Sequence, residues 1–311
     1  MRRRYDRTRI ETGRGYPGEL PMMDDSLAQR ARACIVAGAL GDVCSQLAGA
    51  GQQALFPSSP RLAAETWLTL ATCEATARAG GRVRPSQVAA VFREWSHRAR
   101  VRTDVANVAP DPTPASEEPV HAPGHVSLGP VLCATPLAFV LDPSREDDRA
   151  ALFAVTRITN DSDEACAAAL SGVLAVRSCL QLDRVPADLL SRTAGALPDS
   201  QVRARLFEAD RRHGTAVDAG DRVPGGGELA DSVARSLVIA TRYSDGDLVA
   251  AFGEARQFGR DGQGIAALTG QILGAAGADV PREWLERLPD RAEVEAVLER
   301  FVQTVAALPA W

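Results

Sequence analysis

The residues with the clearest chemical potential are acids that lie beside glycines or near the predicted starts of helices. They fall in four stretches, residues 38–44, 63–70, 160–165 and 259–270. A carboxylate can act as a general acid or base, and it can also supply oxygen ligands to Mg²⁺. An acid at a helix N-terminus can equally be structural, because it accepts hydrogen bonds from free N–H groups and complements the helix dipole. For each stretch taken alone, both interpretations stay open.

Helices must position these four stretches, because the apolar residues recur at helical spacing along most of the chain. A first helix is predicted to begin near Ser26, and the glycine-containing run 38–42 is predicted to end or bend it. A second is predicted over 61–79, closed by Gly80 and Gly81, and a third over the stripe from Val88 to Trp95. Further apolar stripes occupy 152–158, 169–180, 233–240, 265–276 and 294–305. With no alternating strand pattern, the fold class is predicted to be all-α, one orthogonal or bundled helical domain.

Composition narrows the function classes. The chain has 311 residues, of which 45% are hydrophobic and 24% charged, with a net charge of -5. That balance is typical of a globular protein and argues against a nucleic-acid partner, which requires a basic surface. The sequence contains no lysine, which excludes Schiff-base and P-loop lysine chemistry. Its six cysteines form no C-x-x-C motif, so we expect buried free thiols and a cytoplasmic location.

The predicted organisation is a single helical domain over residues 25–308, preceded by a mobile tail over 1–24. A proline-rich loop is predicted over 104–125. No apolar run is long enough for a signal peptide or a transmembrane helix, so no membrane partner is expected. The expected partner is a small-molecule ligand, and the sequence does not predict an oligomeric state.

Taken together and in this order, the stretches resemble the motifs of the ADP-ribosylglycohydrolase family. That family has G-x-x-x-G-D-A-x-G, T-D-D-T, T-H-x-x-x-E-A and G-G-D-T-D-T-x-A-A-x-x-G. The matching segments here are Ala37–Val43, Ala63–Thr66, Thr159–Ala165 and Gly259–Gly270, with weaker likenesses at Ser127–Leu137 and Val280–Trp284. The resemblance covers about residues 28–306.

The resemblance implies an all-α fold with a cleft on one side and two metal ions, usually Mg²⁺, at the cleft floor. In the family, the T-D-D and D-x-D-T motifs supply the ligands. The ion pair orients a ribose and activates water for cleavage of an N- or O-glycosidic bond.

This sequence departs from those metal motifs at most ligand positions. Ala63 and Ala64 replace the first Thr and Asp, and Gln263 replaces the second Asp of the last motif. Gly262 and Gly264 stand at both of that motif's Thr positions, and Asn160 replaces the His. Only Glu65 and Asp261 remain as carboxylates at family ligand positions. We therefore predict no metal-ligand residues and no cofactor, or at most one weakly bound Mg²⁺.

The predicted catalytic residues are Glu65 and Asp261. The predicted substrate-binding residues are Asp42, Thr66, Trp67, Asn160, Asp161 and Gln263. Trp67 would offer an aromatic platform for a ring or hydrocarbon, although it could instead be a core residue of the second helix.

Three functional hypotheses follow. The first is a divergent enzyme whose cleft runs metal-independent or single-metal acid–base chemistry on a glycosidic, nucleotide-like or other small-molecule substrate. The second is an inactive pseudo-hydrolase that acts as a binding or regulatory protein. The third is a conventional ADP-ribosyl hydrolase with an aberrant site. The retention of Glu65 and Asp261 together with Trp67 favours the first.

Overall fold

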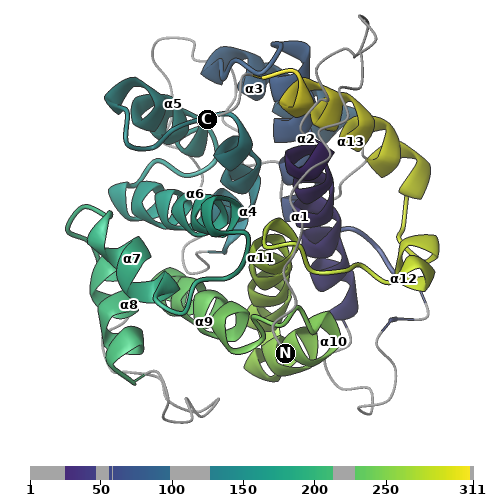
Figure 1. Cartoon of the computed structure of the whole chain (residues 1–311). Coiled ribbons are helices and arrows are strands. Elements are labelled where there is room, and N and C mark those ends of the chain that lie inside the picture. The colour runs from purple at the N-terminus through teal and green to yellow at the C-terminus, as the bar shows by residue number, and fades with distance from the viewer. Residues whose placement is uncertain (1–24, 47–55, 58, 99–126, 213–227, 309–311) are drawn as a thin grey trace, which may run out of the picture.

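The computed structural model describes residues 25–46, 56–57, 59–98, 127–212 and 228–308, which are mainly helical, with no strand among them (Figure 1). The all-α prediction is confirmed. The predicted tail over 1–24 and the predicted loop over 104–125 lie outside the described residues. The helices are α1 Asp25–Cys44, α2 Ala64–Arg78, α3 Pro85–Arg98, α4 Gly129–Ala134, α5 Glu146–Thr156, α6 Asp163–Leu182, α7 Leu189–Gly195, α8 Gln201–Arg212, α9 Glu228–Arg242, α10 Leu248–Ala255, α11 Gly262–Ala275, α12 Arg282–Glu286 and α13 Arg291–Ala306, with 3₁₀ segments η2 Thr135–Phe139 and η3 Arg256–Asp261.

The centre of the domain is an antiparallel pair, α1 and α11, whose backbones touch through glycines (Figure 1). A Cβ atom added to Gly41 would lie 2.3 Å from the carbonyl oxygen of Ala266, and one added to Gly270 would lie 2.3 Å from that of Ala37. The prediction that the run 38–42 ends or bends the first helix is therefore wrong. The helix continues to Cys44, and its glycines permit close helix packing instead of breaking it.

The start of α2 also differs from the prediction. Residues 61–63 are not helical, and Ala63 is extended, with φ −74° and ψ 167°. The N–H of Ala63 donates to a side chain of α1 instead of joining a helical turn, so the helix begins at Ala64. The predicted stop is confirmed, because Gly80 and Gly81 have φ values of 61° and 83°.

The predicted apolar stripe of the third helix is confirmed, since Val88, Val91, Phe92 and Trp95 are all buried. Helix α6 is long and apolar enough to cross a membrane by length and composition. However, 72% of its apolar window is buried inside the fold, as in the core helix of a globular domain. The six cysteines are free and buried, as expected.

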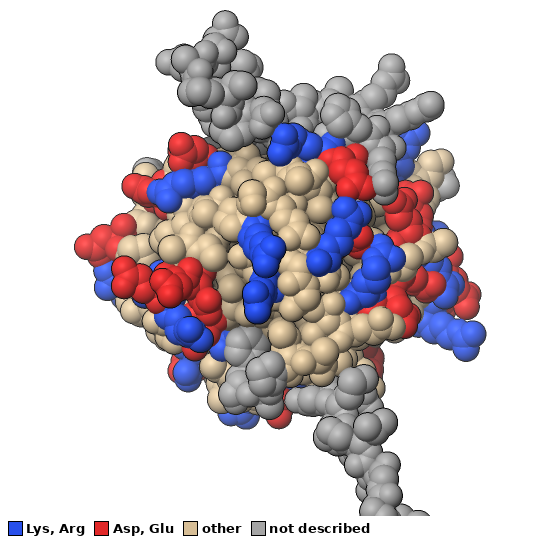
Figure 2. All heavy atoms as spheres, turned by 90° about the horizontal axis from the view of Figure 1, so that it is seen from above, with Lys and Arg blue, Asp and Glu red and all other residues tan. Residues whose placement is uncertain are grey.

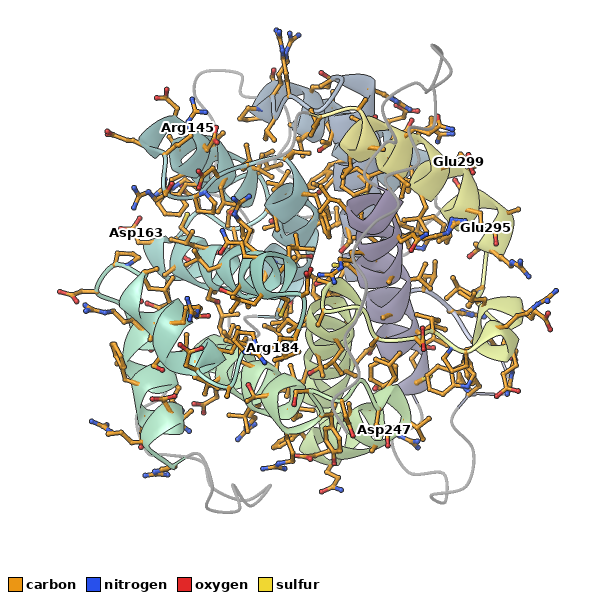
Figure 3. The ribbon with its side chains drawn as sticks, in the orientation of Figure 1. Arg145, Asp163, Arg184, Asp247, Glu295 and Glu299 are labelled. Carbon is orange, nitrogen blue, oxygen red and sulfur yellow. The ribbon has the colours of Figure 1, made fainter. Side chains whose placement is uncertain are left out.

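The charged side chains lie mainly at the periphery, as Arg145, Asp163 and Glu299 illustrate (Figure 3). On the face shown in Figure 2, acidic and basic residues are interspersed. Elsewhere in the described residues many charged side chains form ion pairs, for example Arg157 with Asp163 at 2.6 Å and Arg78 with Glu94 at 2.7 Å.

Candidate active site

The carboxylate of Asp42 is the centre of the candidate site. Its Oδ2 atom accepts hydrogen bonds from the hydroxyl of Thr66 at 2.5 Å and from the N–H of Ala63 at 2.8 Å. Its Oδ1 atom accepts one from the amide of Gln263 at 2.5 Å and a long one from the amide of Gln46 at 3.5 Å. Asp42 is only 2% exposed. Four donors from three parts of the chain thus converge on one buried carboxylate, which we call the Asp42 cluster.

Helix ends bring these groups together. Asp42 lies in the last turn of α1, Thr66 in the first turn of α2, and Gln263 is the second residue of α11. Because α1 and α11 are antiparallel and in close contact, the end of one lies beside the start of the other. The glycine contacts therefore set the register that places Gln263 against Asp42.

Burial is the main influence on Asp42, and it raises the pKa of the carboxyl above its ordinary value. The hydrogen bonds from Thr66, Gln263, Ala63 and Gln46 oppose that rise, because each favours the ionised form. Every one of these donors is a neutral group. Within the described part of the chain, Asp42 is therefore held by hydrogen bonds from neutral groups, with no ion pair among its partners.

Glu65 lies next to the Asp42 cluster but faces α4. It is half-buried, and a Cβ atom added to Gly129 would lie 3.3 Å from its Cγ atom. Burial, with a smaller contribution from the Glu65 charge, raises the pKa of the Cys133 thiol to about 12. A thiol with so high a pKa is a poor nucleophile, so Cys133 offers no reactive thiolate on this side of the site.

Asp261 lies at the junction of η3 and α11, two residues before Gln263. It is half-buried, and among the described residues it makes no side-chain cap hydrogen bond to α11. Gly259 turns the chain into this junction with φ 62° and ψ −124°, a conformation that favours glycine. A Cβ atom added to Gly264, in the next turn, would lie 3.2 Å from the side chain of Leu128. The starts of α2 and α11 therefore both adjoin the segment 127–130.

Trp67 packs edge-on against Trp95 of α3, with ring centroids 5.7 Å apart. It is half-buried, so part of the indole remains accessible. This contact matches the core interpretation of Trp67 on one side of the ring, whereas a ligand platform would have to use the accessible part.

Asn160 and Asp161 lie in the turn between α5 and α6. Asp161 is paired with Arg157 at 3.1 Å, and Asn160 accepts a hydrogen bond from the hydroxyl of Ser162 at 3.1 Å. No hydrogen bond among the described residues joins either side chain to the Asp42 cluster. Of the predicted site residues, the structure links Asp42, Thr66 and Gln263, places Glu65 and Asp261 beside them in the chain, and leaves Trp67, Asn160 and Asp161 in other contacts.

Glu164, in the same stretch, has a structural role. Its carboxylate accepts hydrogen bonds from the N–H groups of Gln201 at 3.1 Å and Val202 at 2.7 Å, at the start of α8. This is the capping role that acids near helix starts were expected to offer as the alternative to chemistry.

Sequence reasoning missed Gln46 and the backbone of Ala63 as members of the Asp42 cluster. Gln46 also bonds the carbonyl oxygen and the N–H of Arg61, and so ties the end of α1 to the segment before α2. The available signal was the i, i+4 spacing of Asp42 and Gln46, which places both on one helix face.

The donor set does not suit the pair of Mg²⁺ ions that the resemblance implies. Magnesium requires oxygen ligands, whereas the groups that surround Asp42 present N–H and O–H hydrogens to it. Ala63 and Ala64 contribute methyl groups where oxygen ligands would be needed. In the described part of the chain, no group of three or more His, Cys, Asp or Glu residues could hold a metal ion.

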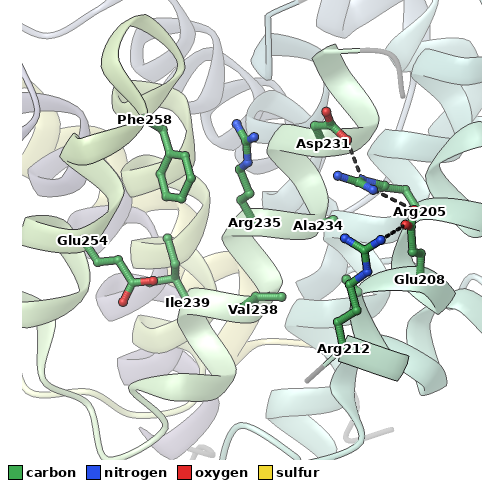
Figure 4. A pocket seen from close by; sticks show the side chains of 11 residues that line it. Arg205, Glu208, Arg212, Asp231, Ala234, Arg235, Val238, Ile239, Glu254 and Phe258 are labelled. Carbon is green, nitrogen blue, oxygen red and sulfur yellow. Dashed lines mark hydrogen bonds and ion pairs between the residues drawn. The ribbon is translucent and has the colours of Figure 1, made fainter. Parts of the chain in front are cut away.

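A separate, shallow recess that is partly open to solvent lies between α8, α9, α10 and η3 (Figure 4). Its floor is apolar and formed by α9. Its charged residues form ion pairs, Arg205 with Asp231 at 2.5 Å and Arg205 with Glu208 at 2.6 Å, and Arg235 lies 4.6 Å above the ring of Phe258. Phe258 belongs to η3, so this one segment borders both the recess and Asp261. None of the residues predicted from sequence lines this recess.

Comparisons with known proteins agree with the fold. A family model described as ADP-ribosylglycohydrolase matches residues 23–309. A solved structure described as an ADP-ribosylglycohydrolase-related protein complex has 19% sequence identity and a TM-score of 0.62, and the match covers 90% of this chain and 99% of that chain. Among curated proteins, none matches this chain.

Proposed function

Because this chain belongs to the ADP-ribosylglycohydrolase family, we propose that it is a divergent enzyme on that fold without a dinuclear metal centre. Its cleft would run acid–base chemistry on a glycosidic, nucleotide-like or other small-molecule substrate. We also propose that the protein is cytoplasmic and binds neither nucleic acid nor a membrane. The enzyme would use no cofactor, or at most one weakly bound Mg²⁺. Phosphate groups of the substrate would complete the coordination shell of that ion.

The observation that carries the proposal is the neutral surroundings of Asp42. Both of its carboxylate oxygens already accept hydrogen bonds from protein donors, so neither is free to bind an ion without breaking the cluster. Glu65 and Asp261 are the carboxylates left beside this cluster, one near each of the helix starts that adjoin residues 127–130.

In the proposed reaction, one of these two acids protonates the leaving-group atom as the glycosidic bond breaks. The other accepts a proton from the water whose oxygen forms the new bond to carbon. Together these steps balance as a hydrolysis that consumes one water and needs no oxidant or reductant. Thr66 and Gln263 would act through Asp42, because they fix the ends of the helices that carry the two acids.

The test starts from ADP-ribose and an ADP-ribosylated arginine peptide, each assayed for binding by thermal shift and for hydrolysis with and without EDTA. Glu65→Gln and Asp261→Asn keep the shape of the side chain and remove its charge. Each should lower the rate of hydrolysis by roughly 10²-fold or more, the usual contribution of one acid–base group. Asp147→Asn, which changes an exposed acid in α5, is the matched control and should leave the rate unchanged.

Two other outcomes would favour the alternatives. If ADP-ribose stabilises the protein but no turnover occurs, and neither substitution weakens binding, the chain is a pseudo-hydrolase with a binding or regulatory role. If hydrolysis is fast and EDTA abolishes it, the chain is a conventional metal-dependent hydrolase and the proposal is wrong.

A further inference from the structure

We propose that the amide of Gln263 stands in for a cation in the candidate active site, so that the three helix ends assemble around Asp42 without metal. Gln263 is thus a positioning residue, because it acts on the site through Asp42. This inference rests on the proposed function only in placing the active site at these helix ends.

The geometry singles out Gln263 among the donors to Asp42. Its Nε2 atom lies 2.5 Å from Oδ1, the oxygen that otherwise accepts only the long bond from Gln46. The other oxygen, Oδ2, has two donors that come from α2 and the residue before it. Gln263 therefore provides the hydrogen bond that joins the buried carboxylate to α11.

The charge environment makes this amide decisive. Burial and four hydrogen bonds account for the pKa of Asp42, and no charged side chain is among its causes in the described part of the chain. Burying a carboxylate without a counter-charge is costly unless donors compensate it. The partial positive charge of the Gln263 N–H group supplies that compensation at Oδ1.

An acid at position 263 would place a second negative charge against Asp42 where the structure has a hydrogen-bond donor. Two carboxylates at hydrogen-bond distance in a buried site cannot both be ionised unless a cation or a proton lies between them. Glutamate has nearly the shape of glutamine, so Gln263→Glu changes the charge and leaves the volume almost unchanged. The identity of this one residue should therefore decide whether the assembled site requires a metal ion.

The experiment measures melting temperature at mildly alkaline pH, in EDTA and in millimolar Mg²⁺, for the full-length protein. The wild type should melt at the same temperature in both conditions. Gln263→Glu should melt lower in EDTA, with a loss on the order of 5 °C, and should regain most of that loss in Mg²⁺.

Gln271→Glu is the matched control, because it makes the same change at a buried amide of the same helix. The Gln271 amide donates to the carbonyl oxygen of Leu132 at 3.2 Å and not to a carboxylate. This variant should lose stability in both conditions, with no recovery in Mg²⁺.

A second variant keeps the inference testable if Gln263→Glu fails to fold. The exchange of acid and amide in Asp42→Asn/Gln263→Glu restores one carboxylate and one amide, so it should be more stable in EDTA than Gln263→Glu and should not respond to Mg²⁺. Three results would overturn the inference. Mg²⁺ could raise the melting temperature of the wild type as much as it raises that of Gln263→Glu, or it could leave that of Gln263→Glu unchanged. The double variant Asp42→Asn/Gln263→Glu could also still require Mg²⁺ for its stability. None of these results depends on hydrolysis, so they are distinguishable from a failure of the proposed function.

Discussion

At the scale of the residue, Asp42 shows how neutral hydrogen-bond donors can hold a buried carboxylate. Its donors are a hydroxyl, a backbone N–H and two amides. Hydrogen bonds to a charged acceptor are stronger than those between neutral groups. Asp42 therefore couples the end of α1 to the starts of α2 and α11, and the candidate catalytic acids depend on that coupling for their positions.

Asp42→Asn should destabilise the protein by about 1–3 kcal/mol. Asparagine replaces one carboxylate oxygen with an NH2 group, so at least one of the present donors to Asp42 would face another donor and lose its acceptor.

Burial raises the pKa of Asp42 in the folded protein above 3.8, its ordinary value. The folded state then binds more protons than the unfolded state between those two pKa values, so the wild type loses stability as pH rises through that interval. Urea unfolding across this interval should show the advantage of the wild type over Asp42→Asn shrinking with rising pH. An advantage that grows with pH would mean that the hydrogen bonds outweigh burial and that the pKa of Asp42 is lowered.

At the scale of the element, the register of α1 against α11 determines the candidate site. The two helices touch where Gly41 meets Ala266, where Gly270 meets Ala37 and where Gly274 meets Ala33. The contacts recur every four residues along both helices, and residue numbers rise along α1 as they fall along α11, as in an antiparallel pair. A shift of one helix along the other would separate Gln263 from Asp42.

Gly270→Ala should destabilise the protein by at least about 1–3 kcal/mol, the usual range for overpacking, because the new methyl group would lie 2.3 Å from the carbonyl oxygen of Ala37. Gly253→Ala is the control, since a Cβ atom in that exposed part of α10 meets nothing within 4 Å. The control should be neutral or stabilising by roughly 0.5–1 kcal/mol, because alanine is the better helix former. Chemical denaturation of both variants measures the difference. Equal stability of the two would show that the contact between α1 and α11 is looser than described.

At the scale of the whole molecule, the last helix returns to the second and closes the domain (Figure 1). Glu74 of α2, which is buried, accepts hydrogen bonds from Arg78 of the same helix at 2.7 Å and from Arg300 of α13 at 2.9 Å. Arg78 continues the network to Glu94 of α3. The helix that carries Glu65 and Thr66 is thus fixed at its far end by residues from two other helices.

Glu74→Gln should lower the free energy of unfolding by about 1–3 kcal/mol, because two guanidinium groups would lose their charged acceptor. We expect less than for a fully buried pair, since the side chains of Arg78 and Arg300 are 39% and 49% exposed and water can solvate them. Glu295→Gln removes a surface pair within α13 and should change stability by less than about 0.5 kcal/mol. A loss for Glu74→Gln no larger than for Glu295→Gln would contradict a role of this network in closing the domain.

The sequence by itself determined the fold class and the substitutions in the metal motifs. Apolar residues at helical spacing predict helices because one face of each helix must be buried, and the stripe from Val88 to Trp95 is buried as expected. The replacement of oxygen ligands by Ala63, Ala64 and Gln263 is a matter of residue identity and needs no coordinates. For the same reason, the order of the motifs was enough to suggest the family.

Only the tertiary structure decided what each side chain contacts. The Gly38–Asp42 run suggested a helix end, yet a helix elsewhere in the chain occupies the space that its missing side chains leave. Asp42 and Gln263 are 221 residues apart, so nothing local predicts that one donates to the other. The sequence is equally consistent with Trp67 as a ligand platform and as a core residue, and only the structure shows that Trp95 packs against one side of its ring. Spacing along the chain specifies which face of a helix a residue occupies, but the packing of distant helices specifies its partner, and a buried polar group acquires its chemistry from that partner.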